Sequence, residues 1–366
     1  MTAEREIAGF ALPFAAGILS AGFFSYYEAV FSGGFSCLAL ILVMSFIMHD
    51  RFHLHSTALQ ISVIASAAFL CGGIIHTAAS CMSISSVPDT GFITACARHF
   101  CGQLKENIDS LPFDKPLTGA VMKAFITGDR TDIDREVIHT FRESGASHIL
   151  ALSGMHLGLI YLIINRMISF IGNSTAAIRI RSTVLILTCG FYCLATGAGA
   201  SITRSFLFIL LHELSRLTYR KPSLKVIMFS SMVIQLSVNP LSISSASFQL
   251  SYAAISGLVF IHPHLKGFWP GLKRPKGMLQ KIWESASLSI SCQLTTFPLT
   301  WHLFGTFPAN FLITNLIAIP LTGIIIPLSL LTMALHSGGI CPSAVIEITE
   351  KCIYLLTESL RIISTM

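Results

Sequence analysis

Residues capable of chemistry gather in one apolar stretch of the chain, SGASHILALSGMHLGLI, which runs from Ser144 to Ile160. Histidines, serines and glycines alternate there with aliphatic residues. A polar group in hydrocarbon costs several kcal/mol unless it finds a partner. We therefore expect this stretch to pack helices closely, to line a wet path, or to do both. Its candidate positions are His148, Ser153, Gly154 and His156.

The spacing within the stretch allows two kinds of site. Ser153 and His156 are three residues apart and would share a helix face, as a Ser–His nucleophile pair requires. However, no intramembrane acid is near to orient the histidine, and no G-x-S-x-G motif is present. Gly154 and Gly158 form a G-x-x-x-G pattern, which is typical of close helix packing, with Ser153 as an interhelical hydrogen bonder. We therefore predict packing or a polar path, and no enzymatic activity.

Two further polar residues fall inside apolar segments. Arg204 follows the small-residue run GAGAS near the predicted outer end of a span. It either snorkels outward or supplies a cation at a pore mouth that meets phosphates. If Gln249 is buried, its amide needs a hydrogen-bond partner. Two roles would supply one, a place on a polar pathway or a contact between packed helices.

Motifs for metals, cofactors and nucleotides are missing from the sequence. There is no P-loop, H-E-x-x-H or C-x-x-C, and two histidines in an H-x-H pair do not make a zinc site. We expect neither a metal nor a cofactor. The sequence leaves open whether a disulfide forms among the cysteines predicted to lie outside, which are Cys81, Cys96 and Cys101.

The composition indicates a membrane protein. The chain of 366 residues is 53% hydrophobic and 11% charged, whereas soluble domains carry about 25% charged residues. We predict an all-α, polytopic integral membrane protein with about ten transmembrane helices of roughly 20 residues each, plus amphipathic interfacial helices. The predicted spans are 7–24, 34–49, 58–79, 147–170, 179–197, 201–218, 223–239, 246–263, 283–303 and 307–335.

Lysine and arginine follow these spans in a regular order. They flank every second loop, and the short loops between carry none. The positive-inside rule then places the N-terminus in the cytoplasm, and also the C-terminus if there are ten spans. The same order places the long loop 80–146 outside the cytoplasmic membrane. The net charge of +6 is therefore mostly a topology signal.

Other elements follow from periodicity and helix signals. The pattern predicts an amphipathic helix on the membrane over 92–111, a helix over 117–127, and a third that opens at Thr131 or Asp132 and ends at Gly145. Residues 343–362 are predicted as an interfacial helix rather than an eleventh span. Bends or breaks are expected at prolines of the second half, which are Pro240, Pro298, Pro308, Pro320 and Pro327.

Five segments of the chain resemble, in the order in which they occur along it, the core of the ComEC/Rec2 competence proteins. Residues 1–80 are similar to the family's N-terminal three-span unit. The resemblance covers roughly residues 115–335, and its segments are ITGDR (126–130), FRESGASHILALSGMHLGL (141–159), ASITRSFLFILL (200–211), NPLSISSASFQLSYAAISGL (239–258) and PLTWHLFGTFPANFLITN (298–315).

This resemblance implies a bacterial inner-membrane channel that takes up single-stranded DNA during natural transformation. Full-length members carry an OB-fold domain and a metallo-β-lactamase-like domain. Neither is recognisable here, because the outer loop is short and helical and no H-x-H-x-D-H motif occurs. The resemblance then implies a channel domain, with membrane lipids around it, whose DNA receptor, nuclease and helicase-like motor are separate proteins, or else a divergent relative that carries another cargo. His148, Ser153, Gly154, His156, Arg204 and Gln249 carry over as path or packing positions.

The predicted organisation has four parts. They are an N-terminal three-span unit (1–80), an extracytoplasmic amphipathic helical segment (81–146), a competence-type channel domain (147–340) and a C-terminal interfacial helix (341–366). Two alternatives to the channel stay open. One is a membrane-embedded enzyme that acts on a lipid or phosphate-containing substrate through Ser153 and His156. The other is a small-solute transporter, although neither intramembrane acids nor an inverted repeat is visible.

Overall fold

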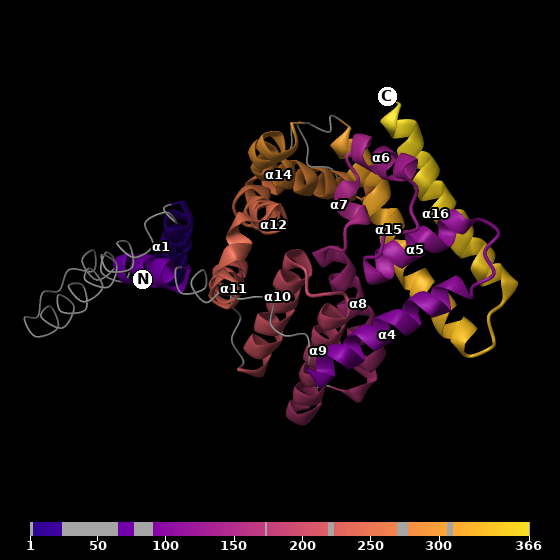
Figure 1. The fold of residues 1–366 in the computed structure, drawn as a ribbon, viewed down its shortest axis with the longest axis horizontal. Helices are drawn as coiled ribbons and strands as arrows, with labels where there is room; N and C mark the ends of the chain where they lie inside the picture. The colour runs from indigo at the N-terminus through magenta and orange to yellow at the C-terminus, as the bar shows by residue number, and fades with distance from the viewer. Residues whose placement is uncertain are drawn as a thin grey trace, which may run out of the picture. The chain divides into compact units, whose positions relative to one another are not determined.

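The computed structural model describes residues 3–23, 65–76, 91–172, 174–218, 223–268, 277–305 and 310–365 (Figure 1). Every regular element in these ranges is helical and none is a strand, in agreement with the predicted all-α class. The chain divides into two compact units. One is Met1–Asp89 with Leu210–Gln249, and the other is Thr90–Ile209 with Leu250–Met366.

The first unit is built on a close contact between two helices. Its elements are α1 (Ala3–Phe23), a helix over Ala65–His76, α11 (Leu224–Val238) and the 3₁₀-helix η3 (Pro240–Ser244). A Cβ atom on Gly17 would lie 1.8 Å from the Phe69 carbonyl oxygen, and one on Gly72 would lie 2.1 Å from that of Phe14. Only glycine permits this backbone approach.

The second unit contains most of the helices. Two of the three boundaries between units fall inside α10 (Ala200–Leu217) and α12 (Ala246–Ser256). The other elements are α4 (Phe92–Asp109), α5 (Pro116–Thr127), α6 (Arg135–Glu143), α7 (Ser147–Leu150), α8 (Gly154–Met167), η2 (Ile168–Ile171), α9 (Thr175–Ala195), the π-helix η4 (Gly257–Ile261), α13 (His262–Gly267), α14 (Met278–Phe304), α15 (Phe311–Ser337) and α16 (Ser343–Ser364).

Helix α5 lies at the centre of the main hydrophobic core. Every residue from Ala120 to Thr127 is buried, and the surrounding core comes from α6, α7, α15 and α16. The expected helix over 117–127 is therefore present, but it is enclosed on all sides rather than amphipathic. Its apolar residues occupy consecutive positions, and a helix that is apolar all round belongs in an interior. Figure 1 shows α16 running beside α15 around this core.

Helices α4 and α6 match the expected elements with changed bounds or contacts. Helix α4 buries Ala97, Cys101 and Ile108 and packs against α9 and α5, while Phe92 at its start is exposed. Helix α6 begins at Arg135, later than expected. Thr131 uses its backbone N–H and its hydroxyl to bond Asp129 Oδ1, at 3.0 and 2.8 Å, and so forms a turn ahead of the helix.

The expected helix end at Gly145 is confirmed. Gly145 has a φ of +82°. Its N–H bonds the Arg142 carbonyl at 3.0 Å, and the N–H of Ala146 bonds the Phe141 carbonyl at 2.7 Å. These two bonds form the Schellman pattern that satisfies the last carbonyls of a helix.

Two lysines fasten α4 to the turn before α6. Lys123 is buried, and its Nζ lies 2.7 Å from Asp109 Oδ1 and 2.5 Å from Asp132 Oδ2. Burial lowers the pKa of Lys123, but the hydrogen bonds and charges of the two aspartates outweigh burial and raise the pKa overall. Lys105 Nζ lies 2.5 Å from Asp129 Oδ2.

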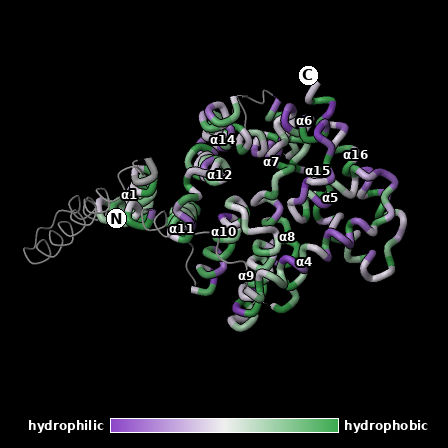
Figure 2. The backbone as a smooth tube through the Cα atoms, viewed as in Figure 1, coloured by the Kyte–Doolittle hydropathy of each residue, from purple (hydrophilic) through white to green (hydrophobic). Residues whose placement is uncertain are grey.

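Three helical segments in the described residues are long and apolar enough to cross a membrane. They are Gly154–Ile171, Thr175–Ala195 and Phe311–Ser337. They correspond to three of the ten predicted spans, and span 34–49 lies outside the described residues. The apolar helices Ile7–Ser20, Ala65–His76 and Leu224–Val238 are shorter. Figure 2 shows the contrast between apolar α15 and charged α6.

Three of the prolines singled out in the sequence lie inside continuous helices. Helix α14 continues through Pro298, and α15 continues through Pro320 and Pro327. Pro240 begins η3, and Pro308 lies outside the described residues. In the span predicted over 246–263, the irregularity is the π-helix η4, which contains no proline. The helices are therefore not broken at Pro298, Pro320 and Pro327, and bends at these positions stay a prediction.

The Asp129 contacts give a prediction on stability. Asp129 accepts hydrogen bonds from Lys105, first of all, and from Thr131, and these lower the pKa of its carboxyl group. An Asp129→Asn substitution should reduce the free energy of unfolding at pH 7 by about 1–2 kcal/mol, as expected for a charged hydrogen bond. Thermal unfolding in detergent measures the change.

The sign of the pH dependence follows from the lowered pKa. The stabilisation by Asp129 is present above the unfolded-state pKa of about 4 and disappears as pH falls through the folded-state pKa. The gap between parent and variant should therefore close in acid. Asp114→Asn, at an exposed position, is the matched control. An equal effect of both substitutions, or a gap that persists in strong acid, would contradict the assignment.

Candidate functional site

The stretch from Ser144 to Ile160 contains a helix break, so that the predicted single helix over 147–170 is wrong. Helix α7 ends at Leu150, and α8 begins at Gly154. Between them the backbone is extended, with ψ of 136° at Ala151 and φ/ψ of −121°/171° at Ser153. Serine favours this conformation at a helix N-cap, and no proline is involved. His148 and His156 therefore do not belong to one continuous helix.

Ser153 and His156 form a capping pair at the start of α8. The backbone N–H of Ser153 donates to His156 Nδ1 at 3.1 Å, and Ser153 Oγ lies 2.9 Å from the same nitrogen. Because Nδ1 accepts the backbone N–H, the neutral ring carries its proton on Nε2. That nitrogen is buried without a hydrogen-bond partner among the described residues. The Phe125 ring lies edge-on to the imidazole, 5.7 Å away.

Of the two glycines in the G-x-x-x-G pattern, one makes a close contact. A Cβ atom on Gly154 would lie 2.3 Å from Ser205 Oγ and 3.6 Å from Arg204 Nη2, both on α10. A Cβ atom on Gly158 would meet no atom within 4 Å among the described residues. The close packing predicted for the pattern therefore holds at Gly154 and not at Gly158.

Arg204 lies inside the second unit rather than at its surface. The side chain is 7% exposed, and the guanidinium carbon lies 5.8 Å above the centre of the Tyr252 ring on α12. Its Nε and Nη1 are buried, with no hydrogen-bond partner among the described residues. The outward, snorkelling placement is therefore wrong. The cation is enclosed beside the first residue of α8, with an aromatic face on one side.

The two other predicted residues make contacts of their own. His148, in α7, is exposed, and its Nδ1 lies 3.1 Å from the Gly145 carbonyl oxygen. Gln249 belongs to the first unit, where its amide Nε2 donates to the Ile243 carbonyl of η3 at 3.0 Å. This bond satisfies a backbone oxygen, as a packing role requires, and leaves the pathway role of Gln249 as a prediction.

Three residues that lie against Gly154, Arg204 and His156 were not predicted from the sequence. Ser205 fixes the α8–α10 contact, Tyr252 faces the arginine, and Phe125 faces the imidazole. Each lies within or next to a quoted family segment, but spacing alone gives no sign that α5, α8, α10 and α12 supply neighbouring side chains. The cysteines Cys96 and Cys101 are free, and Cys81 lies outside the described residues.

The chemistry of this group favours an anion. The N-terminus of α8 carries the positive end of the helix dipole. Arg204 adds a full positive charge and unpaired N–H groups, which form strong bonds to phosphate or carboxylate oxygens. The described residues contain no group of three metal-ligating side chains that would hold a metal ion. The group, called here the Arg204 site, comprises Ser153, Gly154, His156, Arg204 and Tyr252.

Comparison with known sequences identifies the family. The family described as Competence protein matches residues 125–366, which include the whole Arg204 site. The chain therefore belongs to the Competence protein family.

Two curated relatives match most of the same region. The chain is 25% identical to ComE operon protein 3 of Bacillus subtilis (strain 168) over 213 residues, 58% of the chain and 25% of that protein. It is 24% identical to the uncharacterized protein YcaI of Escherichia coli (strain K12) over 245 residues, 66% of the chain and 31% of that protein. The match thus spans a third or less of each relative's length. No solved structure matches the chain.

The contrast between the two glycines gives a testable prediction. Gly154→Ala should destabilise the protein by about 1–3 kcal/mol, because the new methyl group overpacks the α8–α10 contact. Gly158→Ala should be neutral or slightly stabilising, because alanine has the higher helix propensity and meets open space. Thermal unfolding of the purified protein provides the measurement.

A second substitution tests the cause. Ser205→Ala removes the hydroxyl that the methyl group would meet, so that Gly154→Ala combined with Ser205→Ala should regain part of the lost stability. Equal effects of the two glycine substitutions, or no recovery in the double variant, would contradict the contact.

Proposed function

We propose that this chain is a membrane channel that passes single-stranded DNA into the bacterial cytoplasm during natural transformation. Membership in the Competence protein family over residues 125–366 carries the proposal, since competence is the capacity to take up DNA. The similarity to ComE operon protein 3 supports it. The three long apolar helices support a location in the cytoplasmic membrane.

The Arg204 site supports the choice of cargo. A strand of DNA carries one phosphate per nucleotide, and a channel for it needs cations that meet those phosphates. Arg204 offers buried, unpaired N–H groups next to a helix N-terminus, and both features favour phosphate. In this proposal the site is a contact point for successive phosphates on the path. Ser153 and His156 then serve as the cap that begins α8.

The membrane arrangement belongs to the same proposal. The chain crosses the inner membrane about ten times, with a cytoplasmic N-terminus and residues 80–146 on the outer side. Lysine and arginine flank every second loop, and this alternation of basic and non-basic loops supports the topology. The 22-residue helix α16 buries one stripe, formed by Thr349, Ile353, Leu356, Leu360 and Ile363, which suits an interfacial helix packed on α15.

The channel acts with other proteins. In this proposal, the force and the degradation of the second strand are assigned to separate chains. We propose a DNA receptor outside, a nuclease for the second strand and a helicase-like motor in the cytoplasm. The basic residues between α10 and α11 and between α13 and α14 lie in loops assigned to the cytoplasm, where such a motor would meet them.

DNA entry tests the channel. Labelled DNA should bind to cells that lack the chain but fail to reach their cytoplasm. Arg204→Gln should lower entry about tenfold at normal protein level, the loss expected when one charge-assisted phosphate bond is removed. Arg166→Gln, the same change at an exposed position on α8, should leave entry unchanged. Cytoplasmic label per cell is the readout.

The same cells separate the channel from its rivals. Normal entry without the chain would refute the channel. The enzyme alternative rests on the 2.9 Å contact between Ser153 Oγ and His156 Nδ1, and it predicts that Ser153→Ala abolishes turnover of a lipid or phosphate ester. The channel predicts that Ser153→Ala weakens entry only as far as it destabilises the start of α8.

A further inference from the structure

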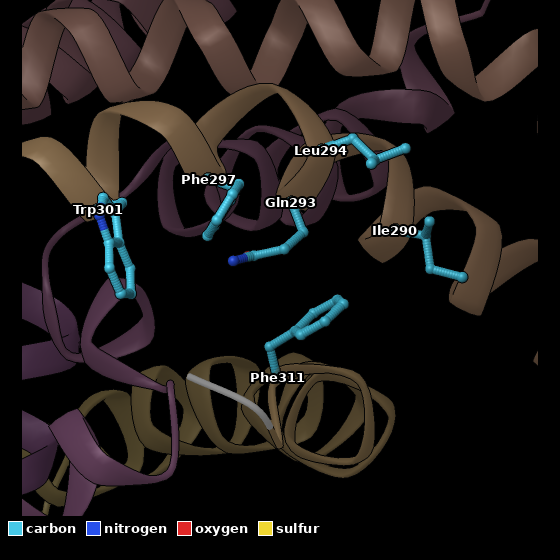
Figure 3. A pocket seen from close by; sticks show the side chains of 6 residues that line it. All are labelled: Ile290, Gln293, Leu294, Phe297, Trp301 and Phe311. Atoms are coloured by element: carbon cyan, nitrogen blue, oxygen red, sulfur yellow. The ribbon is translucent and has the colours of Figure 1, made fainter. Parts of the chain in front are cut away.

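A second feature of the larger unit lies between α14 and α15. It is a pocket of about 390 Å³ lined by side chains of both helices. Figure 3 shows that three lining residues, Gln293, Phe297 and Trp301, project from α14 toward Phe311 at the start of α15. Ile290 and Leu294 complete the lining. None of these residues belongs to the Arg204 site.

The sequence explains why these three side chains share one face of α14. Gln293, Phe297 and Trp301 follow each other at intervals of four residues, which places them one above the other on a helix. The ring centres of Phe297 and Trp301 are 6.3 Å apart, at an interplanar angle of 49°. Trp301 is 57% exposed and Phe297 41%, so that the aromatic faces remain accessible. Flat π surfaces thus line the pocket.

One polar atom in this pocket has no partner. The amide Nε2 of Gln293 is buried and makes no hydrogen bond to the described residues. In Figure 3 its nitrogen extends into the space between Phe297 and Phe311. A buried donor that stays unpaired is unfavourable, which means that a suitable ligand brings an acceptor to this point.

The lining also excludes some ligands. None of the described side chains that line the pocket is charged. A phosphate would therefore find no cation there. An acyl chain would fill the apolar space but would leave the Gln293 amide unpaired. A flat ring with hydrogen-bonding groups on its edge meets both demands.

We propose that this pocket binds a nucleobase of a single-stranded DNA chain, with the base stacked on the aromatic rings and its edge bonded to Gln293. This proposal rests on the proposed function, because it supplies the base contact of the transported strand. Aromatic stacking tolerates any base, since every base has a π face, and a channel must accept all sequences. A single amide adds orientation without strict selection.

A fluorescence experiment tests the pocket on the full chain in detergent. The sequence has three tryptophans, Trp269, Trp283 and Trp301. Changing the first two to phenylalanine leaves Trp301 as the only reporter. A short oligothymidylate should quench its emission on binding. An abasic strand of the same length and charge should bind about tenfold more weakly, as expected for the loss of one stacked base.

Side-chain variants locate the contact. Gln293→Leu should weaken binding of the oligothymidylate several-fold while leaving the abasic strand unaffected, because only a base uses the amide. Gln280→Leu, the same change at an exposed position of α14, should alter neither strand. The two strands are compared on one and the same reporter chain, so that misfolding of a side-chain variant cannot mimic a difference between them.

The possible results of these experiments separate the base pocket from an acyl-chain pocket and from the channel itself. Equal binding of the two strands would overturn the base pocket. Quenching of Trp301 by brominated phospholipid that oligothymidylate does not relieve would overturn it in favour of an acyl chain. If DNA entry requires the chain but both strands bind equally, the channel stands and the pocket fails. If the base binds while cells without the chain import DNA normally, the pocket stands and the channel fails.

Discussion

The contact between Gly154 and Ser205 sets how closely α8 and α10 approach, and the Arg204 site depends on that approach. A helix that begins inside a protein exposes backbone N–H groups that need partners. Here Ser153 and His156 form the cap, and the absence of a side chain at Gly154 lets α10 come near the same helix end. The approach brings the Arg204 guanidinium beside α8, where the helix dipole and the arginine charge have the same sign and together favour an anion.

Helix α5 holds the neighbouring elements around this end. Its last turn is tied to α9 by a hydrogen bond from the Tyr192 hydroxyl to the Ile126 carbonyl, 2.5 Å long. At its middle, Lys123 joins Asp109 at the end of α4 to Asp132 ahead of α6. Helix α5 and its buried Lys123 thus connect α4 and the turn before α6 to α15 and α16. The face that Phe125 presents to His156 is a consequence of this central placement.

The Arg204 site and the α14–α15 pocket offer complementary chemistry. The first presents a buried cation whose Nε and Nη1 have no hydrogen-bond partner among the described residues. The second presents aromatic faces with one unpaired amide and no charge. A polynucleotide alternates an anionic backbone with flat, hydrogen-bonding rings, so that it is one class of ligand that uses both.

Local periodicity, helix caps and composition were enough to predict the helical class, most helix positions, the stop at Gly145 and the candidate residues. The sequence also indicated the family through ordered segments. The tertiary structure decided the rest. The break at Ala151–Ser153 occurs without proline, with Ser153 as the cap of α8, whereas α14 and α15 continue through their prolines. The burial of Arg204, the difference between Gly154 and Gly158, and the meeting of Gln293 with Phe311 arise from contacts between segments distant in the chain, which no local pattern encodes.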